Sequence, residues 1–250
     1  MKLENKVIVV SGGARDIGRE VVLKLAREGA KVVVNYYGST DLAKQTEEDV
    51  RAGGGECVFV QGDMTSAADV DSLVAAGADA FGNRIDGLVN VTGGLVARKT
   101  LSEMDDDFFS HVFRLNVNST FMLTKACVPY MCDGSAIVNL ASQAGRDGGG
   151  PGASAYAASK GAIMTFTRSM AKELGPQNIR VNALCPGVIS TTFHDTFSKN
   201  EVRKNIAAAT PLRREGNPAE IADIVAYLLS EESSFLTGVN LDTNGGLLFS

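Results

Sequence analysis

Several residue types are scarce in this chain, and their scarcity excludes whole classes of site. The sequence has no Trp, two His (His111 and His194) and four Cys, none of them in a CxxC pair. Structural and catalytic zinc sites need clusters of Cys and His, so we expect no metal site. We interpret the cysteines as small buried hydrophobic residues, and unpaired thiols favour a cytoplasmic location.

Long apolar runs and an excess of basic residues are also missing. No stretch of 18 apolar residues occurs, and residues 1–6 lack the apolar core of a signal peptide. Lys and Arg number 24 against 29 Asp and Glu, which gives a formal net charge of −5. An acidic balance argues against nucleic acid or an anionic membrane as the main partner. We therefore expect a soluble protein whose partner is a small molecule.

Short apolar runs that alternate with amphipathic stretches are the main feature that is present. The runs are rich in Val, Ile and Leu without polar alternation, which is typical of strands buried on both faces of a parallel sheet. They are Lys6–Val10, Lys31–Val34, Cys57–Gln61, Gly87–Val91, Ala136–Ala141, Arg180–Leu184 and Val239–Asp242, and helical patterns between them include Glu20–Glu28, Thr40–Ala52, Ala67–Phe81 and Ala155–Leu174. This order predicts the α/β class: a doubly wound (Rossmann) domain with a seven-stranded, mostly parallel sheet and helices on both faces. No linker or repeat divides the chain, so we expect one domain over residues 1–250.

A glycine-rich turn follows the first predicted strand. It reads Ser11-Gly12-Gly13-Ala14-Arg15-Asp16-Ile17-Gly18 and leads into a helix. Glycines at such a junction let the backbone approach a pyrophosphate, and the helix N-terminus offers free N–H groups and partial positive charge. A turn of this kind alone is a weak signal, but its place at the first strand–helix junction favours a dinucleotide site.

The turn resembles the nucleotide-binding segment of the short-chain dehydrogenase/reductase family, Thr-Gly-x-x-x-Gly-x-Gly. Two residues depart from that pattern: Ser11 replaces Thr and keeps the hydroxyl, whereas Asp16 replaces the middle glycine. A carboxylate there lies close to where the phosphates should pass. Either Asp16 points outward and uses the charge of the helix N-terminus, or phosphate affinity is reduced; we favour the first.

Further segments match the same family in order along the chain. Asp63 resembles the residue that caps the adenine amino group, although alone it would be an ordinary turn or N-cap residue. Asn90-Val91-Thr92-Gly93 resembles the family's Asn-Asn-Ala-Gly turn, and Pro186–Thr191 resembles the segment that holds the nicotinamide carboxamide. The resemblance and the turn together assign the following residues to the cofactor: Gly12, Arg15, Ile17, Gly18, Tyr36, Ser39, Asp63, Met64, Asn90, Gly93, Tyr156, Lys160, Pro186, Gly187, Ile189 and Thr191.

The end of the second strand bears on the choice between NAD(H) and NADP(H). An acidic residue about twenty positions past the glycine turn would bind the ribose 2′-hydroxyl and favour NAD(H). Residues 34–40 contain no carboxylate. Arg15 can pair with a 2′-phosphate, with the hydroxyls of Ser39 and Thr40 nearby. We therefore favour NADP(H) over NAD(H), while Asp16 and Asp41 weigh against it and Arg15 alone is also consistent with a solvated surface charge.

Tyr156-Ala157-Ala158-Ser159-Lys160 is the most informative segment for chemistry. On a helix, residues four apart share one face, so the phenol and the ammonium reach the same ligand. We expect Lys160, together with the positive nicotinamide, to lower the pKa of Tyr156, which then exchanges a proton with a substrate oxygen. Ser142, at the end of a predicted strand, would bond the same oxygen.

These residues, with Asn116 upstream, match the Asn-Ser-Tyr-Lys tetrad of the short-chain family, and the resemblance spans about Leu3 to Gly246. It implies an NAD(P)(H)-dependent oxidoreductase acting on a carbonyl or alcohol, with Asn116 holding a water that links Lys160 to solvent. The resemblance also implies a homotetramer, built through the helices predicted at 105–131 and 155–174 and through the C-terminal strand.

Substrate specificity in such folds is set by loops at the strand ends. We expect a lid at about residues 190–209, carrying His194, Lys199, Arg203 and Lys204, with Arg98 and Arg146 in other loops. These charges favour a small polar or anionic substrate such as a keto-acid, aldehyde or sugar derivative, unless they are merely solvated. The alternatives are a 3-oxoacyl-carrier-protein reductase, for which residues 129–135 lack a basic docking patch, and a catalytically silent dinucleotide sensor, which only Asp16 favours.

Overall fold

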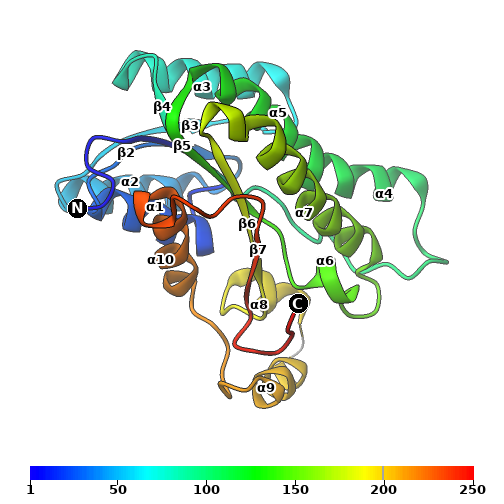
Figure 1. Cartoon of the computed structure of the whole chain (residues 1–250). Helices are drawn as coiled ribbons and strands as arrows, with labels where there is room; N and C mark the ends of the chain where they lie inside the picture. Colours follow the sequence, from blue (N-terminus) through cyan, green and yellow to red (C-terminus); the bar gives the residue numbers. More distant parts are fainter. Residues whose placement is uncertain (199) are drawn as a thin grey trace.

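The computed structural model describes residues 1–198 and 200–250, and its centre is a seven-stranded sheet (Figure 1). The strands lie in the order β3-β2-β1-β4-β5-β6-β7, and every paired neighbour is parallel. Their bounds are β1 Val7–Ser11, β2 Lys31–Tyr36, β3 Glu56–Gln61, β4 Ile85–Asn90, β5 Met131–Leu140, β6 Arg180–Pro186 and β7 Asn240–Thr243. The predicted α/β class and doubly wound sheet are thus confirmed, with a sheet that is entirely parallel.

Helices cover both faces of this sheet. The α-helices are α1 Asp16–Arg27, α2 Thr40–Ala52, α3 Ala67–Phe81, α4 Asp106–Phe113, α5 Ser119–Cys127, α6 Ala144–Asp147, α7 Ser154–Leu174, α8 Thr192–Phe197, α9 Asn200–Ala209 and α10 Pro218–Leu229. Helices α1, α2 and α10 pack together below the sheet in Figure 1, while α3, α5 and α7 lie above it. Among the described residues no helix is both long and apolar enough to cross a membrane.

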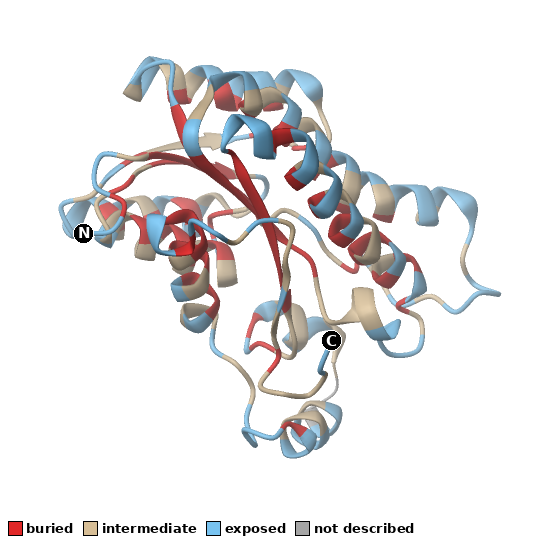
Figure 2. Ribbon diagram, viewed as in Figure 1, coloured by how far each residue is buried: buried red, intermediate tan, exposed pale blue. Residues whose placement is uncertain are grey.

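The core sits on the two sheet faces, where Figure 2 shows the strands as almost continuously buried. All residues of β1 and β4 are buried, and β6 is buried except at its last residue. Side chains from these strands divide between a cluster against α1 and α10 and another against α3, α5 and α7. Burial on both faces explains why the strands lack the alternation of polar and apolar residues seen in half-exposed sheets.

Helix α1 begins at Asp16 rather than Glu20, and two other elements differ more from their predictions. Strand β5 begins at Met131 rather than Ala136, because its first residues pair with the start of β4 across a register irregularity. The helix expected over 105–131 is interrupted at Arg114–Asn118 by one π-helical turn between α4 and α5. A π-helical turn is rare and is found mostly at functional sites. This one contains Asn116.

The strand order reverses direction between β1 and β4. The chain leaving β1 continues to β2 on one side of this point in the sheet, whereas the chain leaving β4 continues to β5 on the other side. The loops that leave the carboxyl ends of β1 and β4 therefore diverge and open a crevice, which is where ligands bind in open α/β sheets. Nearly all of the residues assigned to a ligand from the sequence come from the loops at this edge.

Candidate active site

A cleft of about 1680 Å³ opens at the carboxyl edge of the sheet. Its walls come from the glycine turn before α1, the ends of β2, β3 and β4, the loop after β5, helix α7, and the segment from Pro186 to Ala209. Pockets for one drug-sized ligand usually measure about 300–1,000 Å³. This cleft therefore has room for a dinucleotide and a second, smaller molecule.

In the glycine turn, the backbone at the start of α1 lies very close to the backbone at the end of β1. A Cβ on Gly18 would lie 2.0 Å from the carbonyl oxygen of Gly12, so no other residue fits without moving the turn. Gly12 has φ +68°, in the left-handed region that favours glycine. Ser11 accepts hydrogen bonds at 3.1 Å from the backbone N–H groups of Val91 and Thr92, which joins the ends of β1 and β4. The first N–H groups of α1 thus border the cleft, as a phosphate site requires.

Asp16 does not point outward, which corrects the expectation from the sequence. It has φ +51°, and its carboxylate accepts a hydrogen bond from the Thr192 backbone N–H at 2.9 Å and another from the Thr192 hydroxyl at 2.5 Å. Arg15 donates to the same hydroxyl at 2.6 Å and lies 3.3 Å from the Asp16 carboxylate. The Arg15 guanidinium is therefore directed at α8, and not at the ribose end of the cleft near Ser39.

All but one of the sixteen residues assigned to the cofactor line the cleft. These are Gly12, Arg15, Ile17, Gly18, Tyr36, Ser39, Asp63, Met64, Gly93, Tyr156, Lys160, Pro186, Gly187, Ile189 and Thr191. One oxygen of Asp63 accepts a hydrogen bond from the Thr65 N–H at 2.8 Å, as in an ordinary turn.

Asn90 lies behind the cleft wall instead. It is 3% exposed, and its amide donates to Asn139 at 2.8 Å and to Thr124 at 3.3 Å. Through these hydrogen bonds, the Asn90 side chain joins the end of β4 to β5 and α5.

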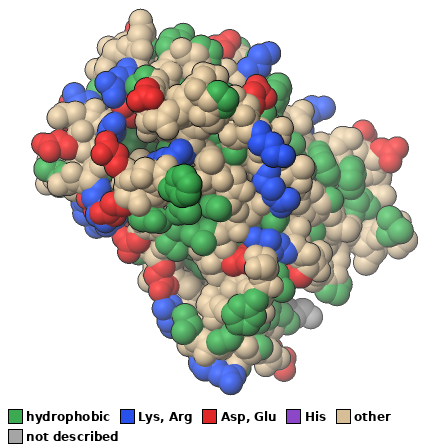
Figure 3. All heavy atoms as spheres, viewed as in Figure 1, with side chains coloured by type: hydrophobic (Ala, Val, Ile, Leu, Met, Phe, Trp, Pro, Cys, Tyr) green, Lys and Arg blue, Asp and Glu red, His purple; other side chains and the backbone are tan. Residues whose placement is uncertain are grey.

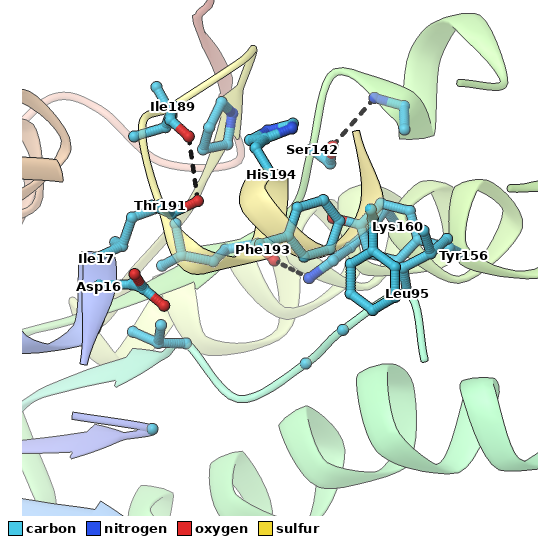
Figure 4. Close-up of a pocket in the computed structure, with 18 of the residues that line it drawn as sticks. Asp16, Ile17, Leu95, Ser142, Tyr156, Lys160, Ile189, Thr191, Phe193 and His194 are labelled. Atoms are coloured by element: carbon cyan, nitrogen blue, oxygen red, sulfur yellow. Dashed lines mark hydrogen bonds between the residues drawn. The ribbon is translucent and has the colours of Figure 1, made fainter. Parts of the chain in front are cut away.

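Ser142, Tyr156 and Lys160 are brought together from the end of β5 and the first turns of α7. Figure 4 shows Tyr156 and Lys160 side by side, with Ser142 nearby. The Lys160 ammonium lies 5.7 Å from the Tyr156 ring centroid and donates a 2.6 Å hydrogen bond to the Leu140 carbonyl oxygen. The helical spacing of four residues thus puts the phenol and the ammonium on one face, as predicted.

Burial controls the ionisation of both groups. It lowers the pKa of Lys160 to about 8, and a smaller effect of Cys185 opposes it. Burial raises the pKa of Tyr156, and the hydrogen bond with Ser142 lowers it by less. The expected depression of the Tyr156 pKa is therefore absent from the protein alone, because desolvation of the phenolate dominates. At neutral pH the pair consists of a neutral phenol and a mostly charged ammonium.

Asn116 is fully buried, and all of its side-chain groups are in use. Its oxygen accepts a hydrogen bond from the Gly94 N–H at 3.0 Å, and its amide donates at 2.9 Å to the carbonyls of Gly94 and Val112. A Cβ on Gly93 would lie 2.5 Å from the Asn116 oxygen and 3.2 Å from the Lys160 nitrogen. The π-helical turn thus fixes the loop after β4 directly beside Lys160. A water held by the Asn116 side chain, as expected from the family, would have to share these groups.

The substrate end of the cleft is apolar and aromatic, which sequence reasoning missed. Phe193 lies 5.9 Å from the Tyr156 ring and 5.2 Å from Phe197, and Leu95 lines the wall beside them (Figure 4). The sequence does carry a signal for this wall, since Phe193 and Phe197 are four residues apart and share one face of α8. His194 stacks edge-on against Phe193, and burial lowers its pKa, so it is neutral.

The basic side chains expected to attract an anionic substrate are occupied elsewhere. Arg98 donates to the carbonyl oxygens of Phe197 and Pro151 at 3.0 and 2.9 Å. Arg146 forms an ion pair with Asp242 at 2.7 Å, and Arg203 is paired with Glu215 at 2.6 Å and with Asp195. Of the remaining two, Lys204 is exposed and is not part of the cleft wall, and Lys199 lies outside the described residues.

Comparison with known proteins agrees with this architecture. Residues 12–248 match the family model described as enoyl-(acyl carrier protein) reductase. An uncharacterized oxidoreductase of Methylorubrum extorquens is 35% identical over 98% of this chain and 99% of its own length. A 3-oxoacyl-[acyl-carrier-protein] reductase of Staphylococcus aureus is 33% identical over 97% and 98%. A short-chain dehydrogenase/reductase structure from Serratia marcescens superposes with a TM-score of 0.93 at 32% identity, covering 99% of both chains.

The relatives align over nearly the whole chain, so the likeness includes the glycine turn, the loops of the cleft and the Tyr156 helix. Membership of their family implies a nicotinamide dinucleotide cofactor. The close backbone approach at Gly18 and the free N–H groups of α1 fit such a group. The chain is an oxidoreductase that belongs to the short-chain dehydrogenase/reductase family.

Proposed function

We propose that the protein transfers a hydride between NADP(H) and the carbonyl or alcohol carbon of a small, neutral and mainly apolar substrate. The observation that carries this proposal is the placement of Ser142, Tyr156 and Lys160 beside the aromatic wall of the cleft. A reacting oxygen within reach of the Ser142 and Tyr156 hydroxyls would put the rest of the substrate against Phe193.

In the reductive direction Tyr156 donates its proton to the oxygen as negative charge develops on it. The raised pKa of Tyr156 keeps the phenol protonated and ready to donate. Ser142 bonds the same oxygen and stabilises the charge as it forms. Lys160, held by the Leu140 carbonyl, places a positive charge next to the phenol and favours loss of its proton in the transition state. A nicotinamide bound beside these residues would supply or accept the hydride.

The remaining residues act as positioning groups. Asn116 fixes Gly93 and Gly94 beside Lys160 through hydrogen bonds to the Gly94 backbone. Asn90 and Asn139 support the ends of β4 and β5 from below. NADP(H) remains our proposal because residues 34–40 contain no carboxylate for a ribose 2′-hydroxyl. The second reason, a free Arg15, is weakened by its contacts with Asp16 and Thr192.

The substrate class is revised from the expectation of a polar or anionic molecule. The arginines on which that expectation rested are bound to carbonyl oxygens or carboxylates. Asp147 lines the cleft, and its partners are neutral: the Gln143 amide and the Gly149 N–H, at 2.9 and 2.8 Å. This carboxylate would repel an anion, and Arg98, Arg146 and Arg203 already have partners, whereas an aryl ring can pack on Phe193.

The test follows NADPH or NADH oxidation at 340 nm with matched carbonyl pairs. Acetophenone and phenylglyoxylate have the same ring and differ by a carboxylate, and butanone lacks the ring. We expect turnover of acetophenone to exceed that of phenylglyoxylate, and Phe193→Ala to raise KM for acetophenone more than for butanone. Tyr156→Phe should abolish turnover of all three. Preference for phenylglyoxylate would contradict the neutral class, and full activity of Tyr156→Phe would contradict the mechanism.

A 3-oxoacyl-carrier-protein reductase is the second candidate, because a Staphylococcus aureus protein of that name is 33% identical over 97% of this chain. Residues 129–135 offer no basic patch for an acidic carrier protein. Turnover of an acetoacetyl thioester alone would favour this candidate. Tight cofactor binding without turnover of any carbonyl would favour the silent sensor.

Assembly as a homotetramer also remains a proposal. Phe109 on α4, Phe121 on α5 and Leu241 on β7 are 42%, 47% and 38% exposed, and all three lie on the elements expected to form the interfaces. Hydrophobic side chains are visible over the α4 end of the molecule in Figure 3. Light scattering coupled to size-exclusion chromatography tests this assembly, with a mass near four times 26.3 kDa expected.

A cytoplasmic location stays a prediction. Cys57, Cys127 and Cys185 are unpaired and buried, and Cys132 is unpaired and partly buried.

A further inference from the structure

Helix α8 is held at both ends by side chains from other parts of the chain. At its start, Asp16 accepts hydrogen bonds from the N–H and the hydroxyl of Thr192. At its end, Arg98 donates to the carbonyl oxygen of Phe197. A negative group at a helix N-terminus and a positive group at a C-terminus both match the helix dipole. These two ties hold α8 against the cleft.

The Asp16 tie crosses the cleft at its phosphate end. Asp16 is the first residue of α1, whose leading N–H groups have no acceptor within the helix and can bind a pyrophosphate. In Figure 4 its carboxylate points away from α1 toward the segment that carries Thr191 and Phe193. The carboxylate thus brings a negative charge, and a bridge between two walls, to the place where two phosphates would lie.

The conformation of Asp16 indicates that the bridge has a cost. Its φ of +51° is in the left-handed region, where glycine is the ordinary choice and Asp or Asn is tolerated less well. The hydrogen bonds to Thr192 and the contact with Arg15 offset this strain. Asn and Gly substitutions preserve the turn, since both accept a positive φ, whereas Ala would not.

We propose that Asp16 is a positioning residue that latches α8 across the dinucleotide site and must be displaced from Thr192 when the diphosphate binds. The latch also sets the substrate pocket, because Phe193 directly follows Thr192 and packs 5.9 Å from Tyr156. Cofactor entry and the position of the aromatic wall are therefore coupled through one carboxylate. This inference goes beyond the proposed function, because it concerns the free protein and its first binding step.

The test measures binding without any carbonyl substrate, so it does not depend on turnover. Dissociation constants for NADPH and for ADP-ribose, which keeps the diphosphate but lacks the nicotinamide, are measured by calorimetry. Asp16→Asn keeps an acceptor for the Thr192 N–H but loses the charge, and Asp16→Gly loses both. We expect each variant to bind both ligands at least tenfold more tightly than the native protein, and by similar factors for the two ligands.

Arg98→Met is the matched control, because it releases the other end of α8 and leaves the phosphate end intact. Amide hydrogen exchange of residues 192–198 in the free protein reports the latch itself. We expect these residues to exchange faster in both Asp16→Gly and Arg98→Met than in the native protein. ADP-ribose binding, in contrast, should tighten by less than threefold in Arg98→Met. Thermal melting confirms that the variants fold.

Three results would overturn the proposal. One is unchanged or weaker ADP-ribose binding in both Asp16 variants. Another is tightening in Arg98→Met equal to that in Asp16→Asn, since helix release rather than the carboxylate would then control affinity. The third is unchanged exchange of α8 in Asp16→Gly.

Discussion

Replacement of Lys160 by Met should stabilise the fold or leave it unchanged at pH 7, although Lys160 is 5% exposed and hydrogen-bonded. Burial lowers its pKa from 10.5 to about 8. Such a depression corresponds to about 3 kcal/mol against the charged form at pH 7. Removal of the ammonium leaves the Leu140 carbonyl without this partner, which costs about 1–3 kcal/mol. The free energy gained when the buried charge is removed is therefore equal to or larger than the free energy lost with the hydrogen bond to Leu140.

The pH dependence separates the two effects. The folded protein holds this proton less firmly than the unfolded chain, so the penalty is complete below pH 8 and disappears as the pH rises through 8 to 10.5. At pH 9.5 only about 1 kcal/mol of this penalty remains. The Leu140 contribution is the same at both values, so the stability of Lys160→Met relative to the native protein should fall by about 2 kcal/mol between pH 7 and pH 9.5.

Urea unfolding of the two proteins at both pH values measures this difference, because other titrating groups are common to both. A difference in free energy of unfolding that is the same at pH 7 and pH 9.5 would refute the reasoning, since Lys160 would then titrate as an ordinary surface lysine. Destabilisation of Lys160→Met by more than about 3 kcal/mol at pH 7 would also refute it, because a lost hydrogen bond alone cannot supply that amount.

Three further predictions concern single contacts. Gly18→Ala should abolish detectable NADPH binding by calorimetry while the protein stays folded, because the new Cβ would lie 2.0 Å from the Gly12 carbonyl oxygen; binding within threefold of native would contradict the tight turn. Arg180→Met should lower the free energy of unfolding by about 3 kcal/mol. Its buried guanidinium donates hydrogen bonds to the carbonyl oxygens of Leu228 and Ser230, at the end of α10, and to the Ser233 hydroxyl. A urea midpoint unchanged from that of the native protein would show that these hydrogen bonds contribute nothing. Asn217→Ala should cost about 1 kcal/mol, because it removes the capping box at the start of α10, with Asn217→Ser as a control that retains most of the stability.

The fold could be predicted because its determinants are local and repeated. Continuous Val and Ile runs require burial on both faces, and helical patterns between them require parallel crossovers. The bounds of α2 and α3 agree with the predicted 40–52 and 67–81. The juxtaposition of Tyr156 and Lys160 was predictable for the same reason, since the period of one helix fixes it. The break at residues 114–118 was not, because it depends on Asn116 bonding to a distant loop.

The sequence by itself determined the fold class, the glycine turn and the face of α7 that carries the chemistry, because each depends on residues adjacent or one helical turn apart. Tertiary structure alone decided where Asp16 and the arginines point. Asp16 and Thr192 are 176 residues apart, and the partners of Arg98, Arg146 and Arg203 are set by which loops meet at the sheet edge. A charged side chain is attracted to any opposite charge or suitable hydrogen-bond partner within reach, and only packing of the elements determines which one is near.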